Sequence, residues 1–365
     1  MAEQQTLQIA YDMTSHHALG GGSYVFKSNY SGYLRSLLPH PEARTEINII
    51  IQPNSSPHIG TLCSLGLAFV LARRMKDIGT DVTVVCDLWD RVKGEQIVIN
   101  NITYQQSLQD TGKFQKFLSD YTELLAILSN RYRITHRIRL EEEFLKSDGV
   151  GGIIREIIKD RDGLIRYLAP ATGRLAIRAA CPECGLVDKY GVNNIYSQGG
   201  SSVSFECPHH GRFEYNVDSD SHRFQFNCQL FNLVIGRYYE RASYNYIEVC
   251  GSDYAGFWQR AVVMALSGQA HLDYWSGSKV SKSLYLQPTA YGYLKRAGQE
   301  YLLSYRIFKQ EKKDFTVLLR EIERWVNEPY RLFRGYSLHY LHLLFEKMEL
   351  SLGIIHKPTS EPETE

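Results

Sequence analysis

One stretch of the sequence, residues 46–90, constrains the fold of this chain more than any other. It opens with a short, almost continuous apolar run at residues 47–51, as expected for a strand buried on both faces of a parallel sheet. A polar, proline-bearing loop and a helical stretch at residues 62–78 follow, and a second apolar run at residues 82–86 completes a strand–loop–helix–strand unit. This unit predicts the α/β class with a doubly wound parallel sheet, in which ligands bind at the carboxyl ends of the strands.

The segment Pro57-His58-Ile59-Gly60-Thr61 lies at the predicted start of this helix. Unpaired backbone N–H groups and the positive end of the helix dipole favour a phosphate there. Gly60 lets a nucleotide approach the backbone closely, and His58 can donate a hydrogen bond to a phosphoryl oxygen. A capped helix start with a surface histidine explains the same residues about equally well.

A second segment, Lys279-Val280-Ser281-Lys282-Ser283, follows far downstream in a loop rich in serine and glycine. Two lysines three positions apart on such a loop can clamp a polyphosphate. An ordinary solvated lysine and serine loop is the alternative, and this segment alone does not decide between the two.

Together and in this order, the two segments resemble the paired signature of class I aminoacyl-tRNA synthetases. In that family a His-Ile-Gly-His-type motif opens the nucleotide-binding fold, and a Lys-Met-Ser-Lys-Ser-type loop closes it. Thr61 stands here in place of the last histidine, and Val280 in place of the methionine. The resemblance implies a Rossmann-like, HUP-type domain that binds ATP and Mg²⁺. It also implies catalytic roles for His58, Lys279 and Lys282, and ATP contacts from Pro57, Gly60, Thr61 and Ser281.

The second half of the nucleotide site is predicted after a strand at residues 246–250. Gly251 and Asp253 follow its carboxyl end, where a glycine for close approach and a carboxylate for ribose hydroxyls are typical of nucleoside recognition. Their place between the two motifs resembles the Gly-x-Asp ribose motif of class I synthetases. A strand-to-helix turn in which Asp253 caps the helix is the alternative, and both can hold.

Two short cysteine knuckles predict a metal site in the middle of the chain. Each has the pattern Cys-x-x-(Cys/His) followed by glycine, which fits tetrahedral zinc, and the four predicted ligands are Cys181, Cys184, Cys207 and His210. His209 competes for the fourth position, but the spacing favours His210. Four protein ligands make a closed site, hence a structural one. The alternative is a disulfide, which a reducing cytosol disfavours.

The region around these knuckles resembles the zinc-bearing insertion of class I lysyl-tRNA synthetases, through residues 143–149, 154–158 and 168–170 and the knuckle Cys-Pro-Glu-Cys-Gly. Residues 87–91 resemble the acidic, aromatic stretch that follows the second strand in that family. Where the family has a Trp-rich run ending in arginine, residues 216–224 differ, and this puts lysine as the substrate in doubt.

Asp87 and Asp90 are the best candidates for holding a substrate ammonium or a cationic side chain. The competing interpretation is a capped loop with a solvated carboxylate pair. The substrate expected from the resemblance is lysine or another cationic amino acid, with tRNA as a possible partner.

The rest of the chain is consistent with a globular protein of the cytoplasm. It is 44% apolar and 22% charged, its net charge of +1 gives no global argument for nucleic acid, and neither a secretory signal nor a membrane span is visible. We expect an N-terminal extension at residues 1–45 and a catalytic domain in two halves, at residues 46–140 and 226–288. The insertion with the zinc knuckles, at residues 141–225, separates the two halves. A helical region at residues 289–356 and a disordered tail at residues 357–365 follow.

The resemblance implies ATP-dependent activation of an amino acid and transfer to tRNA. Residues 289–356 hold at most the first part of the large helical region with which lysyl-type relatives read the anticodon. Three alternatives remain open. The chain could be a ligase that passes the activated amino acid to a small-molecule or protein amine, a tRNA-dependent cyclodipeptide synthase, or a non-catalytic synthetase-like regulator. Both ATP motifs are intact, which argues against the last two.

Overall fold

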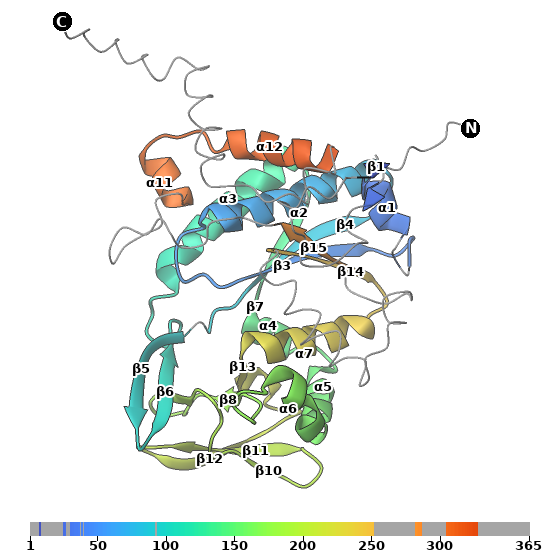
Figure 1. Cartoon of the computed structure of the whole chain (residues 1–365). Helices are drawn as coiled ribbons and strands as arrows, with labels where there is room; N and C mark the ends of the chain where they lie inside the picture. The colour runs from blue at the N-terminus through green and yellow to red at the C-terminus, as the bar shows by residue number, and fades with distance from the viewer. Residues whose placement is uncertain are drawn as a thin grey trace, which may run out of the picture.

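The computed structural model describes residues 7–8, 25–26, 30–36, 38, 40–91, 93–251, 282–286 and 304–327 (Figure 1). In the N-terminal extension, β1 (Leu7–Gln8) pairs antiparallel with β2 (Val25–Phe26). The sequence of residues 30–38 predicts a short helix, which the structure confirms as α1 (Tyr30–Ser36). None of the described helices has the length and apolar character of a transmembrane span.

A parallel sheet of five strands forms the centre of the molecule. Its order is β15 (Lys282–Leu286), β14 (Asn245–Gly251), β3 (Thr45–Ile51), β4 (Val82–Leu88) and β7 (His136–Leu140), and every neighbouring pair runs parallel. The predicted α/β class with a parallel sheet is therefore confirmed. β3 and β4 are joined through α2 (Ile59–Asp77), which confirms the strand–loop–helix–strand unit.

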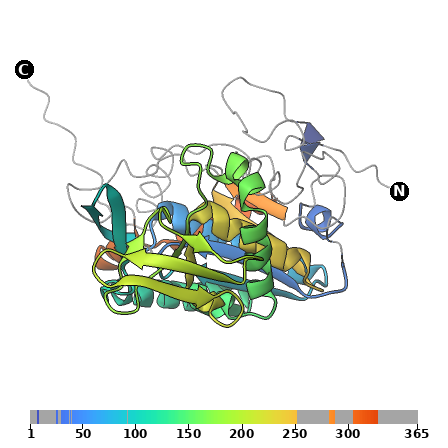
Figure 2. The ribbon, with the colours of Figure 1, turned by 90° about the horizontal axis from the view of Figure 1, so that it is seen from below.

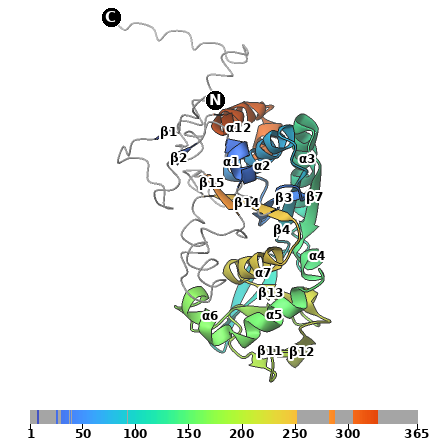
Figure 3. The same ribbon diagram turned by 90° about the vertical axis from the view of Figure 1, so that its right-hand side faces the viewer.

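One face of the sheet is apolar and is covered by α2, α3 (Gln115–Tyr132) and α12 (Thr316–Asn327), which lie above the sheet in Figures 1 and 3. Ile47 and Ile49 of β3 and Val84 of β4 are buried in the same apolar cluster as these helices. Gly66 allows the close approach of α2 and α12, since a Cβ atom there would lie only 2.7 Å from Cδ1 of Ile322. This layer fixes the start of α2 against the sheet.

The opposite face of the sheet is buried but polar, which the apolar run of β3 did not indicate. Glu46, Asn48, Asp87, Arg139 and Glu248 are each no more than 4% exposed, although they come from four different strands. The helix α7 (Cys228–Glu240) lies on this side of the sheet (Figures 1 and 3). The strand β3 is therefore buried on both faces, as predicted, but only one of the two faces is hydrophobic.

A second lobe lies below the sheet and contains the predicted insertion. Its strands are short: β8 (Ile177–Ala179) pairs with β13 (Phe224–Phe226), while β10 (Ile195–Tyr196), β11 (Ser202–Cys207) and β12 (Gly211–Asn216) form a three-stranded sheet. Seen from below in Figure 2, these yellow-green strands face the viewer. The lobe also holds the helices α4 (Glu141–Leu145), α5 (Val150–Lys159), α6 (Arg161–Leu168) and the 3-10 helix η2 (Ser221–Arg223).

The sequence of residues 94–180 predicts a mostly helical segment, and this prediction is wrong at its beginning. β5 (Lys93–Ile99) and β6 (Ile102–Ser107) form an antiparallel hairpin there, and β6 pairs with β9 (Val187–Asp188) of the second lobe. Asn100 and Asn101 have φ angles of 49° and 63°, the conformation of a two-residue hairpin turn. The Asn-Asn pair between two runs rich in β-branched residues was the available sequence signal.

Two helices are described in the C-terminal region. The sequence predicts a helix at residues 300–307, and its described part belongs to α11 (Tyr305–Gln310), which the Ser304 hydroxyl caps by accepting from the N–H of Ile307 at 3.4 Å. The helix expected at residues 315–325 is confirmed as α12. The sequence also predicts helices at residues 256–266, 290–297 and 338–352, and these ranges lie outside the described residues.

Candidate functional site

The carboxyl edge of the parallel sheet brings together most of the described candidate residues. β3 ends at Ile51, which pairs with Leu88 at the end of β4, and Leu88 in turn pairs with Leu140 at the end of β7. β14 lies on the other side of β3 and ends at Gly251. Because α2 leads from β3 to β4, and β14 flanks β3 on the opposite side, the strand order reverses between β3 and β14. Such a switch point is where doubly wound sheets bind ligands.

His58 caps the start of α2. Its ring atom Nδ1 accepts from the backbone N–H of Gly60 at 3.1 Å and from that of Thr61 at 3.4 Å, while its backbone is extended. In a neutral ring this leaves the proton on Nε2, which lies 3.4 Å from the Thr61 hydroxyl oxygen. The capped helix start is therefore present, and the remaining ring nitrogen of His58 is a donor rather than an acceptor. The phosphate contact stays a prediction.

The loop before His58 is held by two helices that sequence reasoning did not connect with it. The carbonyl of Pro57 accepts from the N–H of Tyr305 at 2.8 Å, and the Ser56 hydroxyl accepts from the N–H of Arg306 at 3.2 Å. The Tyr121 hydroxyl of α3 donates to the carbonyl of Ser55 at 3.1 Å. These bonds fix the loop at the switch point, so that the start of α2 has a defined position.

The cap makes a prediction about stability. We expect His58→Ala to lower the free energy of unfolding by about 1 kcal/mol, the usual loss when a capping side chain is removed, whereas His58→Asn keeps an acceptor at the same place and stays within about 0.5 kcal/mol of the natural chain. Urea denaturation of the two variants measures this. Equal losses in both variants would contradict the capping role.

Asp87 lies at the end of β4 on the polar face of the sheet and already carries partners on both carboxylate oxygens. Arg139 binds it in a bidentate manner, with both N···O distances 2.6 Å, and Asn48 donates to it at 2.8 Å. Arg139 also donates to the hydroxyl of Tyr239 at 2.7 Å, and this hydroxyl donates to Glu46 at 3.1 Å. Asp87 is thus part of a buried network that spans three strands and α7. Its predicted contact with a substrate stays a prediction, and Arg139 competes for it.

Asp90, unlike Asp87, has no hydrogen-bonding side chain beside its carboxylate in the part of the chain that the structure describes. It is fully buried, and neither of its carboxylate oxygens has a hydrogen-bond partner among the described residues. Burial raises its pKa to about 6, although the Arg91 charge and nearby backbone N–H groups oppose the rise. The indole N–H of Trp89, the preceding residue, also has no hydrogen-bond partner in the described structure.

Glu141, at the start of α4, is a buried acidic residue that sequence reasoning missed. It is 5% exposed, and its pKa is raised to about 7 by burial, with the Asp90 charge adding to the rise and the Arg91 and Arg178 charges opposing it. The guanidinium of Arg178 is itself buried, which lowers its pKa to about 10. The sequence offered only three consecutive glutamates, Glu141 to Glu143, with nothing to distinguish the first.

The predicted lysine loop is described in part. Lys282 begins β15, and its backbone pairs in register with Ile247, whereas Leu286 pairs with Gly251 at the carboxyl end of β14. The backbone of Lys282 therefore lies toward the amino end of β15, and the described strand does not bring it to the edge that holds His58. Lys279, Ser281 and Asp253 lie outside the described residues, and their roles stay predictions.

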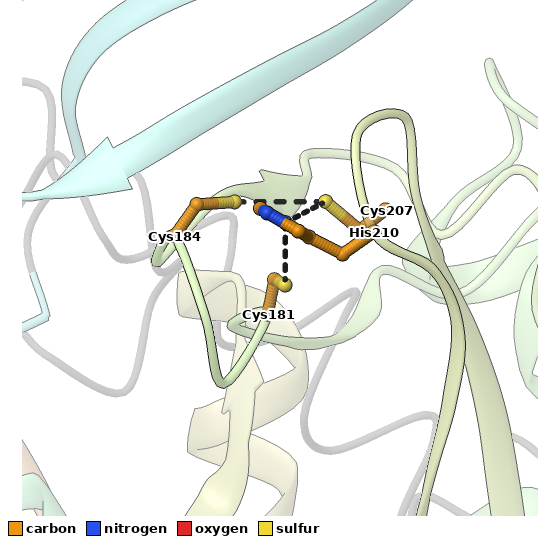
Figure 4. A group of neighbouring side chains, drawn as sticks. All are labelled: Cys181, Cys184, Cys207 and His210. Atoms are coloured by element: carbon orange, nitrogen blue, oxygen red, sulfur yellow. Dashed lines mark hydrogen bonds between the residues drawn. The ribbon is translucent and has the colours of Figure 1, made fainter.

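The two cysteine knuckles converge on one point in the second lobe (Figure 4). The ligand atoms of Cys181, Cys184, Cys207 and His210 lie within 4.8 Å of one another. Nδ1 of His210 is 3.6 Å from the sulfur atoms of Cys181 and Cys207, and the Cys184 and Cys207 sulfurs are 3.6 Å apart. A tetrahedral zinc ion with Zn–S and Zn–N distances of about 2.3 and 2.0–2.1 Å separates its ligand atoms by about 3.5–3.8 Å. The donor set and spacing therefore fit zinc, and His210 rather than His209 completes the cluster.

The backbone around the knuckles prepares these ligands. Gly185 has a φ angle of +73° and donates to the carbonyl of Cys181 at 2.9 Å, which closes the turn between the first two ligands. Burial works against ionisation of Cys207, but N–H groups of His209 and His210 lower the pKa of this thiol to about 7. Nε2 of His210 lies 3.6 Å from a carboxylate oxygen of Glu183, a partner that orients the ring. The three cysteines of the cluster, Cys181, Cys184 and Cys207, form no disulfide.

Comparison with known proteins gives weak likenesses. No protein-family model and no curated protein matches the chain. Among solved structures, the chain is similar to a protein of Campylobacter jejuni described as an arginyl-tRNA synthetase, with TM-score 0.37, 10% identity, and coverage of 81% of this chain and 66% of that chain. It is also similar to a glutamate-tRNA synthetase of Elizabethkingia anophelis, with TM-score 0.37, 9% identity, and coverage of 85% of this chain and 71% of that chain. A tyrosyl-tRNA synthetase of Archaeoglobus fulgidus has TM-score 0.32 and 11% identity, with coverage of 89% of this chain and 95% of that chain. TM-scores below 0.5 do not establish a shared fold.

Proposed function

We propose that this chain activates an amino acid with ATP and passes the activated amino acid to tRNA, in the manner of class I aminoacyl-tRNA synthetases. The observation that carries the proposal is the position of residues 57–61. They form a capped helix start at the switch point of a parallel sheet, and the preceding loop is fixed by α3 and α11. This is the setting in which a helix N-terminus binds phosphate.

In the proposed reaction the carboxylate of the amino acid attacks the α-phosphorus of ATP. The bond between the α-phosphorus and the bridging oxygen to the β-phosphate breaks, which gives an aminoacyl-adenylate and pyrophosphate. Catalysis of this kind consists of positioning and charge stabilisation. His58 would donate from Nε2 to a phosphoryl oxygen, Lys279 and Lys282 would neutralise the pyrophosphate charge, and Asp253 would hold the ribose. Mg²⁺ would accompany ATP and share its phosphate charge.

The insertion would support this site structurally. Cys181, Cys184, Cys207 and His210 would hold a zinc ion whose four positions are all filled by protein ligands. Such an ion takes no part in the reaction. We further propose that the substrate is lysine or another cationic amino acid, which the acidic residues after β4 support.

A non-catalytic synthetase-like binding protein is the second candidate. It is favoured by one observation, the backbone position of Lys282 toward the amino end of β15, away from the edge that carries His58. A catalytic role requires this lysine, or Lys279, to reach the phosphates when ATP is bound. The two candidates therefore differ in whether Lys282 affects any reaction.

The decisive measurement is amino-acid-dependent ATP–pyrophosphate exchange with all twenty amino acids, in the presence and in the absence of total tRNA. We expect exchange with one amino acid. Exchange that appears only when tRNA is added would favour a tRNA acceptor over a small-molecule amine. Absence of exchange both with and without tRNA would overturn the proposed activation and favour the binding protein.

Substitution of Lys282 tests the proposed mechanism. We expect Lys282→Ala to lower the exchange rate at least about 100-fold, the usual effect of removing a group that stabilises transition-state charge. Lys159→Ala is the matched control, because Lys159 is an exposed residue at the end of α5 in the other lobe. Equal rates in the two variants would contradict the role of Lys282.

A further inference from the structure

Asp90 and Glu141 leave the sheet at the same place although they are far apart in the sequence. Leu88 at the end of β4 pairs in parallel register with Leu140 at the end of β7. Asp90 follows the first of these residues, and Glu141 follows the second and opens α4 (Figure 1). The N–H of Trp89 donates to the carbonyl of Ile51 at 2.8 Å, which ties this point to the end of β3 and to the loop that leads to His58.

The two arginines near this acidic pair donate to backbone carbonyls. The guanidinium of Arg91 donates to the carbonyls of Phe224 at 2.9 Å and of His222 at 2.6 Å, and that of Arg178 donates to the carbonyl of Phe226. Within the described ranges, no ion pair includes Asp90 or Glu141. The neighbouring Glu142 is paired with Lys146 at 2.7 Å. Two buried carboxylates thus lie together near two arginines, and neither carboxylate forms an ion pair with a described cation.

Such an arrangement is costly in a protein that has no ligand. A buried carboxylate without partners is stable in its ionised form only when a positive charge approaches it. Both groups respond to this cost, because burial raises the pKa of Asp90 to about 6 and that of Glu141 to about 7. A bound cation would supply the missing partner and favour the ionised form of both residues.

We propose that Asp90 and Glu141 together bind the cationic side-chain group of the amino acid that this chain activates, an ammonium or a guanidinium. This inference rests on the proposed function, and it adds Glu141 as a specificity-determining residue. The pair is at the ends of β4 and β7, beside the strand that leads to His58. A side chain bound there can therefore point away from the switch point while its carboxylate stays near the nucleotide. Asp87 is not included in this pair because Arg139 already binds it in a bidentate manner.

The affinity for the cation depends on pH in a defined direction. The charged groups that face the pair are Arg91, Glu142 and Arg178, from the segment after β4, from α4 and from β8. A raised pKa means that part of the pair is protonated near neutral pH, and a protonated carboxyl attracts a cation poorly. Affinity should therefore rise as the pH increases from about 5.5 to about 8.

The test is equilibrium dialysis of the full chain with radiolabelled L-lysine and L-arginine, with and without total tRNA, and with neutral L-norleucine as the competitor. We expect binding of one cationic amino acid, no competition by norleucine, and a loss of affinity of about 30-fold or more in Asp90→Asn and in Glu141→Gln. Glu143→Gln is the matched control, because it removes the same charge from an exposed position of α4. The binding that remains in Asp90→Asn and in Glu141→Gln should lose its dependence on pH.

Folding of the variants can be checked independently. Burial disfavours ionised Glu141, so the neutral glutamine should leave the thermal midpoint at pH 7.5 unchanged or higher. The inference would be overturned if Asp90→Asn and Glu141→Gln both bound the cationic amino acids as tightly as the unchanged chain does. Exchange of pyrophosphate with a neutral amino acid would also overturn it and would leave the proposed activation standing. Cation binding that depends on Glu141 in a chain without any exchange would support the pocket and overturn the activation.

Discussion

Removal of zinc by a chelator is expected to unfold the second lobe while the parallel sheet stays folded. The strands of this lobe are short, and the turn between Cys181 and Cys184 and the tip of the β11–β12 hairpin are joined by the metal cluster. A structural zinc site contributes its binding free energy to folding, about 10–16 kcal/mol in isolated zinc fingers. Hydrogen exchange of residues 177–216 before and after chelation would measure the effect, and metal analysis would give one zinc ion per chain.

Two neighbouring histidines provide a sharp control for this result. His210 is in the cluster, whereas His209 is exposed and is not part of it. We expect His210→Ala to lose the metal and the protection of the lobe from exchange, and His209→Ala to keep both. A chain that keeps its full metal content in His210→Ala would show that the ligand set is wrong.

Replacement of Arg139 by methionine is expected to destabilise the chain by about 3–5 kcal/mol, because it leaves the buried charge of Asp87 without its partner. Both residues are 4% exposed, and the pair is bidentate with N···O distances of 2.6 Å. The double variant Asp87→Asn with Arg139→Met should recover part of this loss, since no uncompensated charge remains. Urea denaturation of the single and the double variant measures the difference.

The matched control lies on the same strand. Arg137 makes an ion pair with Glu46 at 3.6 Å, but its side chain is 47% exposed to solvent. We expect Arg137→Met to cost less than about 1 kcal/mol, as for other exposed ion pairs. Equal losses for Arg137→Met and Arg139→Met would mean that burial of the Asp87 pair does not determine its energy.

Local patterns were sufficient for the elements that the sequence predicts well. The apolar run, the polar loop and the helical stretch of residues 46–90 depend on neighbours within a few positions, so β3, α2 and β4 followed from them. The same holds for the metal ligands, because the Cys-x-x-(Cys/His) spacing places two donors on one turn without any long-range contact. Even the choice of His210 over His209 came from this spacing.

The polar face of the sheet and the acidic pair were decided only by the tertiary structure. Glu46, Asp87 and Arg139 meet because β3, β4 and β7 are neighbours in parallel register, and no local pattern records which strands pair or in which register. The sequence proposed Asp87 and Asp90 as equivalent carboxylates after one strand. In the folded chain their environments differ, since Asp87 pairs with Arg139 and Asp90 lies near Glu141. The reason is physical: the energy of a buried charge depends on which charges from other strands lie within a few ångströms, and only the packed chain determines that.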